Sequence, residues 1–237
     1  MSEYAANGVS DDGGDSLLID LHSHSRYSDG TATLEHIERA CLERRIGISL
    51  TDHNEIRGAI KLWERDRIPT IPGIEVGTIE GLEFLVYFRD PQALEDYYLA
   101  SVERFLLSRF MVRSKLRSLA AIEDAQGAGG YVSLAHPFAP GRKSIEFHRN
   151  KGPQHAAFVD RVIKSVDAIE LFNGGILRTS NRKADDFSTD CDKPVTAGSD
   201  SHHISTLGSC GIRYRHLHET RGPELFDAVA GDRGRKS

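Results

Sequence analysis

The sequence has few cysteines, no long apolar run and no strongly basic tract before its last residues. The three cysteines, Cys41, Cys191 and Cys210, are odd in number and lack CxxC spacing, which favours free thiols in a reducing compartment. No window approaches the roughly 18 uninterrupted apolar residues of a membrane span, and the N-terminus lacks the basic and apolar segments of a signal peptide. We therefore expect a cytoplasmic protein with no membrane contact.

The composition is that of a globular, mildly acidic protein. Among 237 residues, 30 Lys and Arg stand against 35 Asp and Glu, which gives a net charge of -5. Hydrophobic residues make up 39% and charged residues 27%, a balance that excludes a disordered chain, a collagen-like repeat and a disulfide scaffold. Because positive charge is nowhere concentrated before the last residues, we expect no binding of extended duplex nucleic acid. The composition does not exclude binding of a nucleotide or a short oligonucleotide.

The chain divides into one long ordered region and two short ends. Residues 1–15 are rich in Gly, Ser and acidic side chains, which predicts a flexible leader. Residues 16–231 alternate apolar runs with segments of helical period and contain no repeat or Pro-rich linker, which favours a single domain. Residues 232–237 are expected to be a frayed tail.

Seven short apolar runs are typical of buried strands. They are residues 17–21, 46–50, 70–76, 84–88, 131–134, 168–172 and 194–197. A helix is predicted over 34–45 after Thr33, and a helical insertion over about 90–130. Repeated strand and helix indicate the α/β class, with a parallel sheet or barrel.

Histidines and carboxylates follow the ends of these strands. They are His22, His24 and Asp29 after the first strand, Asp52 and His53 after the second, Glu75 at the end of the third, His136 after the fifth, and Asp200 and His202 after the seventh. Because the carboxyl ends of parallel strands meet at one edge, we expect these side chains to converge there. His22 and His24 lie two residues apart in an extended segment, so both imidazoles can face one cation.

This residue set suits divalent metal ions. Imidazole nitrogens and carboxylate oxygens favour Mn, Fe or Zn, and the lack of nearby cysteine argues against a structural thiolate zinc site. The carboxylates would repel one another unless two or three cations neutralise them, and Glu75 could bridge a pair that acidifies a water. Hydrolysis of a phosphate ester needs this arrangement, because it requires an activated nucleophile and neutralised phosphoryl oxygens.

The ordered motifs resemble those of the PHP (polymerase and histidinol phosphatase) superfamily. They are Asp20-Leu21-His22-Ser23-His24, Ser28-Asp29-Gly30, Thr51-Asp52-His53, Gly73-Ile74-Glu75, Ala135-His136-Pro137 and Gly198-Ser199-Asp200-Ser201-His202. The resemblance implies a distorted (β/α)7 TIM-like barrel and a cluster of two or three metal ions that hydrolyses phosphoester bonds.

The resemblance also implies how the ligands divide. One ion would be held by His22, His24, Glu75 and Asp200, a second by Asp29, His53 and His202, and a third by Glu75 and His136. Members with three ions usually carry a further His on the strand after the bridging glutamate, and residues 81–87 contain none. We therefore predict two firmly held ions and a weak or absent third, unless Glu83 or a water substitutes.

Catalytic roles are predicted for Asp52, His53, Glu75 and Asp200, with Asp52 either orienting His53 or acting as a general base. Arg142 and Arg26 could bind phosphate oxygens, although an exposed loop cation is an equal alternative for Arg142.

Asn173 could hydrogen-bond substrate, but Asn before Gly more often marks a turn. Residues 142–158 are expected to form a mobile lid. The other histidines, His36, His148, His155, His203, His216 and His218, are expected to be solvated.

Together these features predict a metal-dependent phosphoesterase that acts on a small phosphorylated metabolite, nucleotide or short oligonucleotide by attack of metal-bound hydroxide. It would be a phosphoric monoester hydrolase or resemble a 5′-nucleotidase or exonuclease. Two alternatives stay open: an amidohydrolase-like enzyme acting on a carbon centre, and a non-catalytic binding domain stabilised by metal.

Overall fold

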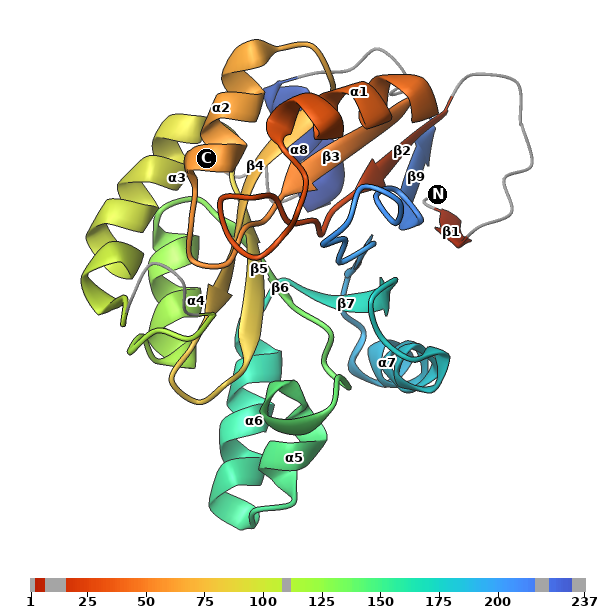
Figure 1. Ribbon diagram of the computed structural model, residues 1–237. Coiled ribbons are helices and arrows are strands. Elements are labelled where there is room, and N and C mark those ends of the chain that lie inside the picture. The colour runs from red at the N-terminus through yellow and green to blue at the C-terminus, as the bar shows by residue number, and fades with distance from the viewer. Residues whose placement is uncertain (1–2, 7–15, 108–111, 216–221, 232–237) are drawn as a thin grey trace.

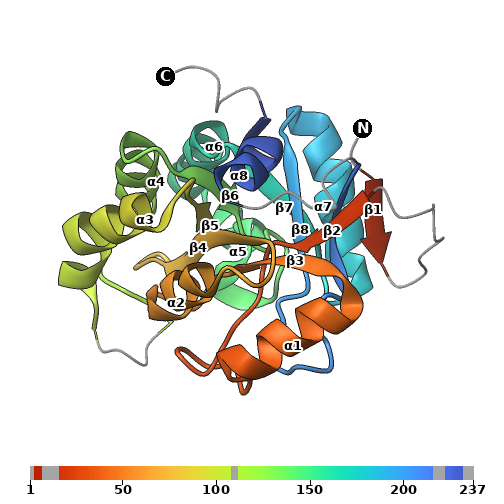
Figure 2. The ribbon, with the colours of Figure 1, turned by 90° about the horizontal axis from the view of Figure 1, so that it is seen from above.

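The computed structural model describes residues 3–6, 16–107, 112–215 and 222–231, and shows a curved central sheet with helices around it (Figure 1, Figure 2). Within these residues nine strands form one sheet in the order β1-β9-β2-β3-β4-β5-β6-β7-β8. Their bounds are β1 Glu3–Ala6, β2 Ser16–Asp20, β3 Ile46–Leu50, β4 Thr70–Gly77, β5 Glu83–Tyr87, β6 Tyr131–Leu134, β7 Ala168–Asn173, β8 Val195–Gly198 and β9 Cys210–Arg215.

The seven predicted strands are present as β2 to β8, with ends within one residue of those predicted. Two further strands were not predicted. β9 lies beside β2, and β1 pairs antiparallel with β9, with Glu3 opposite Arg213. Within the predicted flexible leader, residues 3–6 form β1, because β9 offers them an edge to pair with. Residues 1–2 and 7–15 lie outside the described part of the chain.

The strand directions are mixed, whereas the sequence predicted a parallel arrangement. β2, β3 and β4 are parallel, as are β6, β7 and β8, but β5 is antiparallel to both β4 and β6. The physical reason is the short connection over residues 78–82, which cannot hold the crossover that a parallel neighbour requires. As a result, the first residue of β5, Glu83, lies at the same edge as the last residues of its neighbours β4 and β6.

The two sides of the sheet approach each other at this carboxyl edge. The backbone N of Leu21 donates to the carbonyl of Ala197 over 3.2 Å, which links the end of β2 to β8. A parallel bridge also joins Ser23 to Ser201. The sheet is thus a nearly closed barrel in a single mixed α/β domain, which confirms the predicted distorted TIM-like fold.

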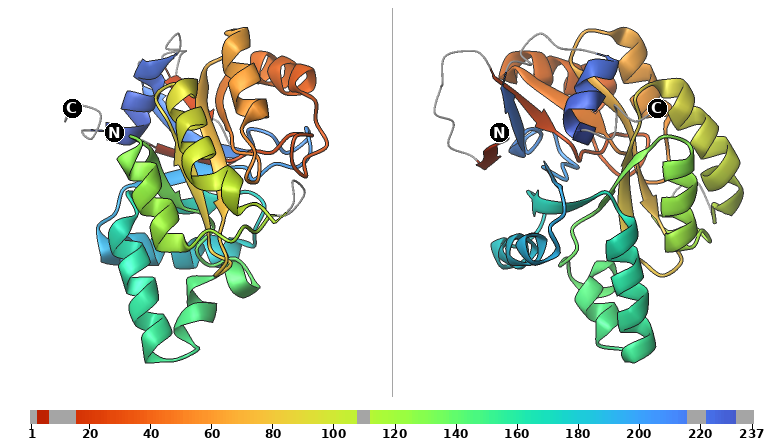
Figure 3. Two further views of the ribbon diagram at one scale, coloured as in Figure 1. Left: turned by 90° about the vertical axis from the view of Figure 1, so that its left-hand side faces the viewer. Right: turned by 180° about the vertical axis from the view of Figure 1, so that it is seen from behind.

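Helices cover the outside of this barrel (Figure 3). Their bounds are α1 Leu34–Arg44, α2 Arg57–Arg65, α3 Pro91–Tyr97, α4 Ser118–Gly127, α5 Ile145–Arg149, α6 Pro153–Ser165, α7 Arg178–Cys191 and α8 Pro223–Ala230, with single turns η1 Tyr98–Val102, η2 Glu103–Phe105 and η3 Gly141–Lys143. α1 begins after Thr33, whose side chain caps the backbone N of His36 at 3.3 Å. No helix among the described residues has the length and apolarity needed to cross a bilayer.

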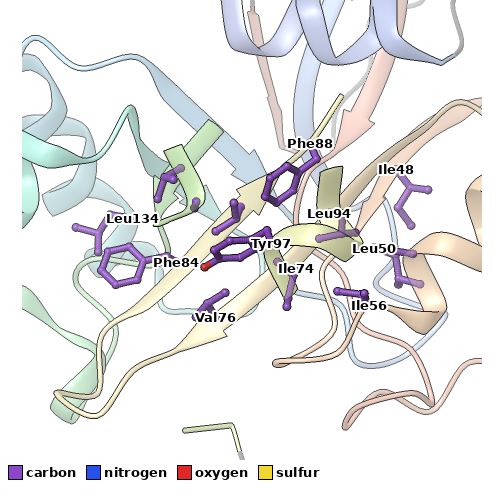
Figure 4. Packing of buried hydrophobic residues seen from close by; sticks show 14 of the residues in the cluster. Ile48, Leu50, Ile56, Ile74, Val76, Phe84, Phe88, Leu94, Tyr97 and Leu134 are labelled. Carbon is purple, nitrogen blue, oxygen red and sulfur yellow. The ribbon is translucent and has the colours of Figure 1, made fainter. Parts of the chain in front are cut away.

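Two apolar clusters hold the fold together. The larger lies between the sheet and the outer helices, and Figure 4 shows Leu94 and Tyr97 of α3 among Ile74, Val76 and Phe84 of the strands. The smaller fills the inside of the barrel with side chains from the strands, and α8 packs against it. Its members include residues at the first or second position of several strands, among them Leu17, Ile71, Tyr131 and Ala168. The amino end of the barrel is therefore apolar, and the carboxyl end is left for polar side chains.

Candidate metal centre

The eight predicted metal ligands come together at the carboxyl edge of the barrel. Their potential ligand atoms form three groups, each with atoms within 4.8 Å of one another. The groups are His24, Asp29, His53 and His202; His22, His24 and Asp200; and His22, Glu75 and His136. Compared with the predicted sets, His24 also joins the outer histidines, and His22 also joins the corner at His136. That these residues ligate metal stays a prediction.

The backbone at the ends of β6 and β8 is unusual in a way that aims two of these side chains. His136 has φ of 26° and Asp200 has φ of 49°, in the left-handed region that L-residues seldom adopt. Gly198, at the end of β8, allows this edge to approach β2, because a Cβ there would lie 2.3 Å from the Cβ of His22. The backbone is thus strained at the two residues whose side chains point into the cluster, His136 and Asp200.

Glu75 is at the centre of the cluster and is fully buried. Its Oε2 lies 2.8 Å from His53 Nδ1, 3.4 Å from His22 Nε2 and 3.4 Å from His24 Nε2. Its Oε1 lies 3.1 Å from His136 Nε2. A single carboxylate therefore faces all of the inner histidines, as a bridging ligand would.

The outer side of the cluster is open to solvent. Asp29 is 45% exposed, and its Oδ2 lies 3.2 Å from His202 Nε2 and 3.6 Å from His53 Nε2. Asp200 joins the outer and inner parts, because its Oδ1 lies 3.2 Å from His24 Nε2 and 3.7 Å from His202 Nδ1. A ligand from solvent would therefore meet Asp29 and His202 first.

The carboxylates of the cluster shift the pKa of several of its histidines. Burial tends to lower the pKa of His22, but the carboxylates around it, Asp200 first among them, hold that pKa well above its usual value. Burial tends to raise the pKa of Glu75, yet the surrounding histidines hold it well below its usual value. The hydrogen bond to Asp29 raises the pKa of His202 to about 9. Metal ions would have to displace protons from such histidines, because only a neutral imidazole can ligate.

Several buried atoms of the cluster make no well-directed hydrogen bond with the described residues, although His53 Nδ1 and Glu75 Oε2 face each other at 2.8 Å. They are His22 Nε2, His24 Nδ1, His24 Nε2, His53 Nδ1, Glu75 Oε2 and His136 Nδ1. Buried polar atoms are nearly always satisfied in folded proteins, so a group of orphans at one point indicates a missing partner. Nitrogen and carboxylate oxygen donors without sulfur fit Mn, Fe or Zn. The residues present therefore fit divalent metal ions.

Two buried carboxylates that the sequence analysis missed support the histidines. Glu170 of β7 accepts from His22 Nδ1 over 2.8 Å and from the backbone N of His136 over 2.6 Å. Asp20 of β2 accepts from both the backbone N and the Oγ of Ser199. Glu170, which accepts from a ring nitrogen, fixes the tautomer and orientation of that histidine, whereas Asp20 holds the backbone next to Asp200. The signal in the sequence was a lone acidic residue inside an otherwise apolar strand.

Asp52, for which a catalytic role was predicted, belongs to none of the three groups of potential metal ligands. Its carboxylate accepts hydrogen bonds from the backbone N and Oγ of Ser25, both at 2.7 Å, and from the Oγ of Ser28 at 2.6 Å. These contacts hold the segment that carries Asp29. In this geometry the Asp52 carboxylate contacts the serines of the loop, and its catalytic role stays a prediction.

The two predicted phosphate-binding arginines lie outside the cluster. Arg26 is exposed and lines a pocket of about 260 Å³ with Glu35 and Arg65, and none of the residues lining that pocket belongs to the three groups. Arg142 is also exposed, on η3. The cation that does reach the cluster is its neighbour Lys143.

Asn173 is buried, and its Nδ2 donates to Glu170 Oε2 over 3.1 Å and to Asp200 Oδ2 over 3.2 Å. It therefore links Glu170 to Asp200, and its contact with substrate stays a prediction.

The segment over residues 142–158 is folded, and its turn and helices pack on one another. Its residues form parts of η3, α5 and α6, and Ile145 and His148 are buried. His148 Nε2 lies 2.9 Å from the carbonyl of Arg142, so the prediction that His148 is solvated was wrong, and this packing argues against a mobile lid. His36, His155 and His203 are exposed as predicted, and His216 and His218 lie outside the described residues.

Comparisons with known proteins agree with this geometry. A model of the PHP domain matches residues 20–169, and a PHP-associated model matches residues 178–230. An uncharacterized protein of Methanocaldococcus jannaschii is 24% identical over 211 residues, which cover 88% of this chain and 75% of that protein.

Solved structures show the same fold. A lesion-specific endonuclease from Pyrococcus furiosus has a TM-score of 0.69 at 17% identity, over 91% of this chain and 56% of that one. An amidohydrolase from Chromobacterium violaceum has a TM-score of 0.63 at 19% identity, over 92% and 100% of the two chains. A protein from Bifidobacterium adolescentis, assigned as a metal-dependent phosphoesterase, has a TM-score of 0.57 at 17% identity, over 78% and 88%. The match of the PHP domain model to more than half of its residues shows that this chain belongs to the PHP domain family.

Proposed function

We propose that this protein hydrolyses a phosphoester bond in a small phosphorylated metabolite, a nucleotide or a short oligonucleotide, with the help of divalent metal ions. The observation that carries the proposal is the convergence of five histidines and three carboxylates around buried atoms that have no hydrogen-bond partner among the described residues. Two such ions, Mn, Fe or Zn, would supply an acidified water and neutralise the phosphoryl oxygens.

The residues of the chain divide the remaining work. Glu75 presents both carboxylate oxygens to the inner histidines and excludes water from that end, because it is fully buried. Asp29 and His202 lie at the exposed side, where a phosphate from solvent would first meet the cluster. Asp200 lies between the two parts, close to His24 and His202. Preorganised polar groups of this kind stabilise developing charge without rearranging during the reaction.

The choice of a small substrate rests on charge. The chain is acidic, with a net charge of -5, and long nucleic acids are gripped chiefly by basic residues that neutralise phosphates. The related Pyrococcus furiosus protein is an endonuclease, so damaged duplex DNA belongs in any test of substrates. The free thiols of Cys41, Cys191 and Cys210 favour the predicted cytoplasmic location.

The experiment measures phosphate release, and cleavage of the substrates that release no phosphate, with protein that was stripped of metal by chelator and reloaded with Mn²⁺. The panel holds nucleoside mono- and bisphosphates, sugar phosphates, short oligonucleotides, duplex DNA with an abasic site, and carboxylic esters and amides. His202→Ala is compared with His203→Ala, which removes the exposed neighbouring imidazole and serves as the control. We expect phosphate release that His202→Ala abolishes and His203→Ala retains. Cleavage of esters or amides alone would replace the proposal with carbon-centred hydrolysis, and cleavage of duplex DNA alone would replace the small substrate.

A further inference from the structure

One corner of the metal centre already contains a cation of the protein itself. At this corner His136 Nε2 lies 3.1 Å from Glu75 Oε1 and 3.1 Å from Glu83 Oε2. Lys143 Nζ lies 2.7 Å from the same Oε2 of Glu83. An ammonium group of the chain therefore contacts Glu83, the carboxylate next to His136 of the third potential metal group.

The fold places both members of this pair. Glu83 reaches the corner because β5 runs antiparallel to its neighbours, so that its first residue lies at the carboxyl edge. Lys143 ends the η3 turn, which begins shortly after His136. The turn is fixed from behind, since the backbone N of Ile145 donates to the carbonyl of Pro137 over 2.9 Å. Lys143 is thus held at the corner by a packed segment.

The negative charge of the two buried carboxylates at this corner requires a compensating cation. Glu75 and Glu83 are both almost completely buried, and a buried carboxylate is costly unless a cation or several hydrogen bonds compensate it. A metal ion shared by Glu75, Glu83 and His136 would do so, but it would stand close to the Lys143 ammonium and be repelled by it. Because a lysine side chain carries its charge at neutral pH without any ligand, the ammonium is always available.

We propose that Lys143 is a permanent cation that takes the charge-balancing place of a metal ion at the corner formed by Glu75, Glu83 and His136, so that the chain binds two metal ions and not three. The inference rests on the proposed metal centre but not on the reaction. Lys143 is 41% exposed, so its side chain can be replaced without opening the core.

The test is the number of Mn²⁺ ions per chain after equilibrium dialysis, measured by mass spectrometry of the metal. Wild type is compared with Lys143→Met, which removes the charge, and with Arg142→Met, an exposed neighbour on the same turn. We expect two ions in wild type and in Arg142→Met, and three in Lys143→Met. Adding Glu83→Gln to Lys143→Met should return the number to two, which locates the extra ion.

Three tightly bound ions in wild type would overturn the inference, and so would two ions in a folded Lys143→Met variant. If Lys143→Met does not fold, Lys143→Gln, which keeps a hydrogen bond to Glu83 without charge, is measured in its place with the same expectations. Phosphate release is recorded separately, because a protein that gains the third ion but cleaves no phosphoester keeps this inference and refutes the proposed function.

Discussion

Glu170→Gln tests whether the buried carboxylates behind the histidines set their chemistry. In the native chain Glu170 Oε1 accepts from His22 Nδ1 at 2.8 Å, and Oε2 accepts from the backbone N of His136 at 2.6 Å and from Asn173 Nδ2 at 3.1 Å. Both oxygens thus face donors. Glutamine offers one acceptor and one donor group, so it can satisfy only one side.

Either orientation of the new amide has a measurable cost. If its NH₂ faces His22, the ring proton must move to Nε2, the nitrogen that faces Glu75 and Asp200, and His22 can then no longer ligate through that atom. If its NH₂ faces the backbone N of His136, a buried donor is left unpaired, which costs about 1–3 kcal/mol of stability. We expect metal affinity to fall about 10- to 100-fold, as for other partners of ligating histidines.

The assay is competition for Mn²⁺ with a chromophoric chelator, combined with urea unfolding of metal-free protein. Glu123→Gln, the same change at an exposed position on α4, is the control and should match wild type in both measurements. A Glu170→Gln variant that binds Mn²⁺ as tightly as wild type and unfolds at the same urea concentration would refute the reasoning.

Three other expectations concern protons, packing and the outer loop. Because the pKa of His202 is raised to about 9, we expect its imidazole to be protonated at pH 7.5 in metal-free protein, so metal binding should release protons at this pH and fewer above pH 9. Calorimetry in two buffers of different ionisation enthalpy measures this proton release. Finding no release at pH 7.5 would contradict the expectation. Phe84→Ala, in a fully buried position, should lower the free energy of unfolding by about 3–5 kcal/mol in urea, and a loss below about 1 kcal/mol would show that the packing is misjudged. Asp52→Ala should free the loop that Ser25 and Ser28 anchor, and with it the predicted ligand Asp29, so that bound Mn²⁺ falls from two ions to one. This account fails if both ions remain bound.

The strands and the cluster could be predicted from the sequence because both depend on local pattern. Short apolar runs mark buried strands, and the polar residues that follow them must meet at one edge once the strands are parallel. That rule is sufficient to place residues as distant in the sequence as His22 and Asp200 at the same edge of the barrel.

The rest depended on facts that local pattern does not contain. The direction of β5 follows from a short connection, and it alone decides that Glu83 lies at the same edge as Glu75. Similarly, Arg142 and Lys143 are adjacent in the sequence, and only the η3 turn determines which of the two reaches the cluster. Asp52 carries the same carboxylate as Asp200, but serine donors occupy it.

The central claim is that the cluster at the carboxyl edge is a metal centre that cleaves phosphoesters. The most direct measurement is a titration of Mn²⁺ into chelator-stripped protein, with bound metal and phosphate release from the preferred small substrate recorded on the same samples. The account predicts that phosphate release appears as the second ion binds and disappears when chelator is added. Two bound ions with no phosphate release from any phosphorylated substrate of the panel would contradict it.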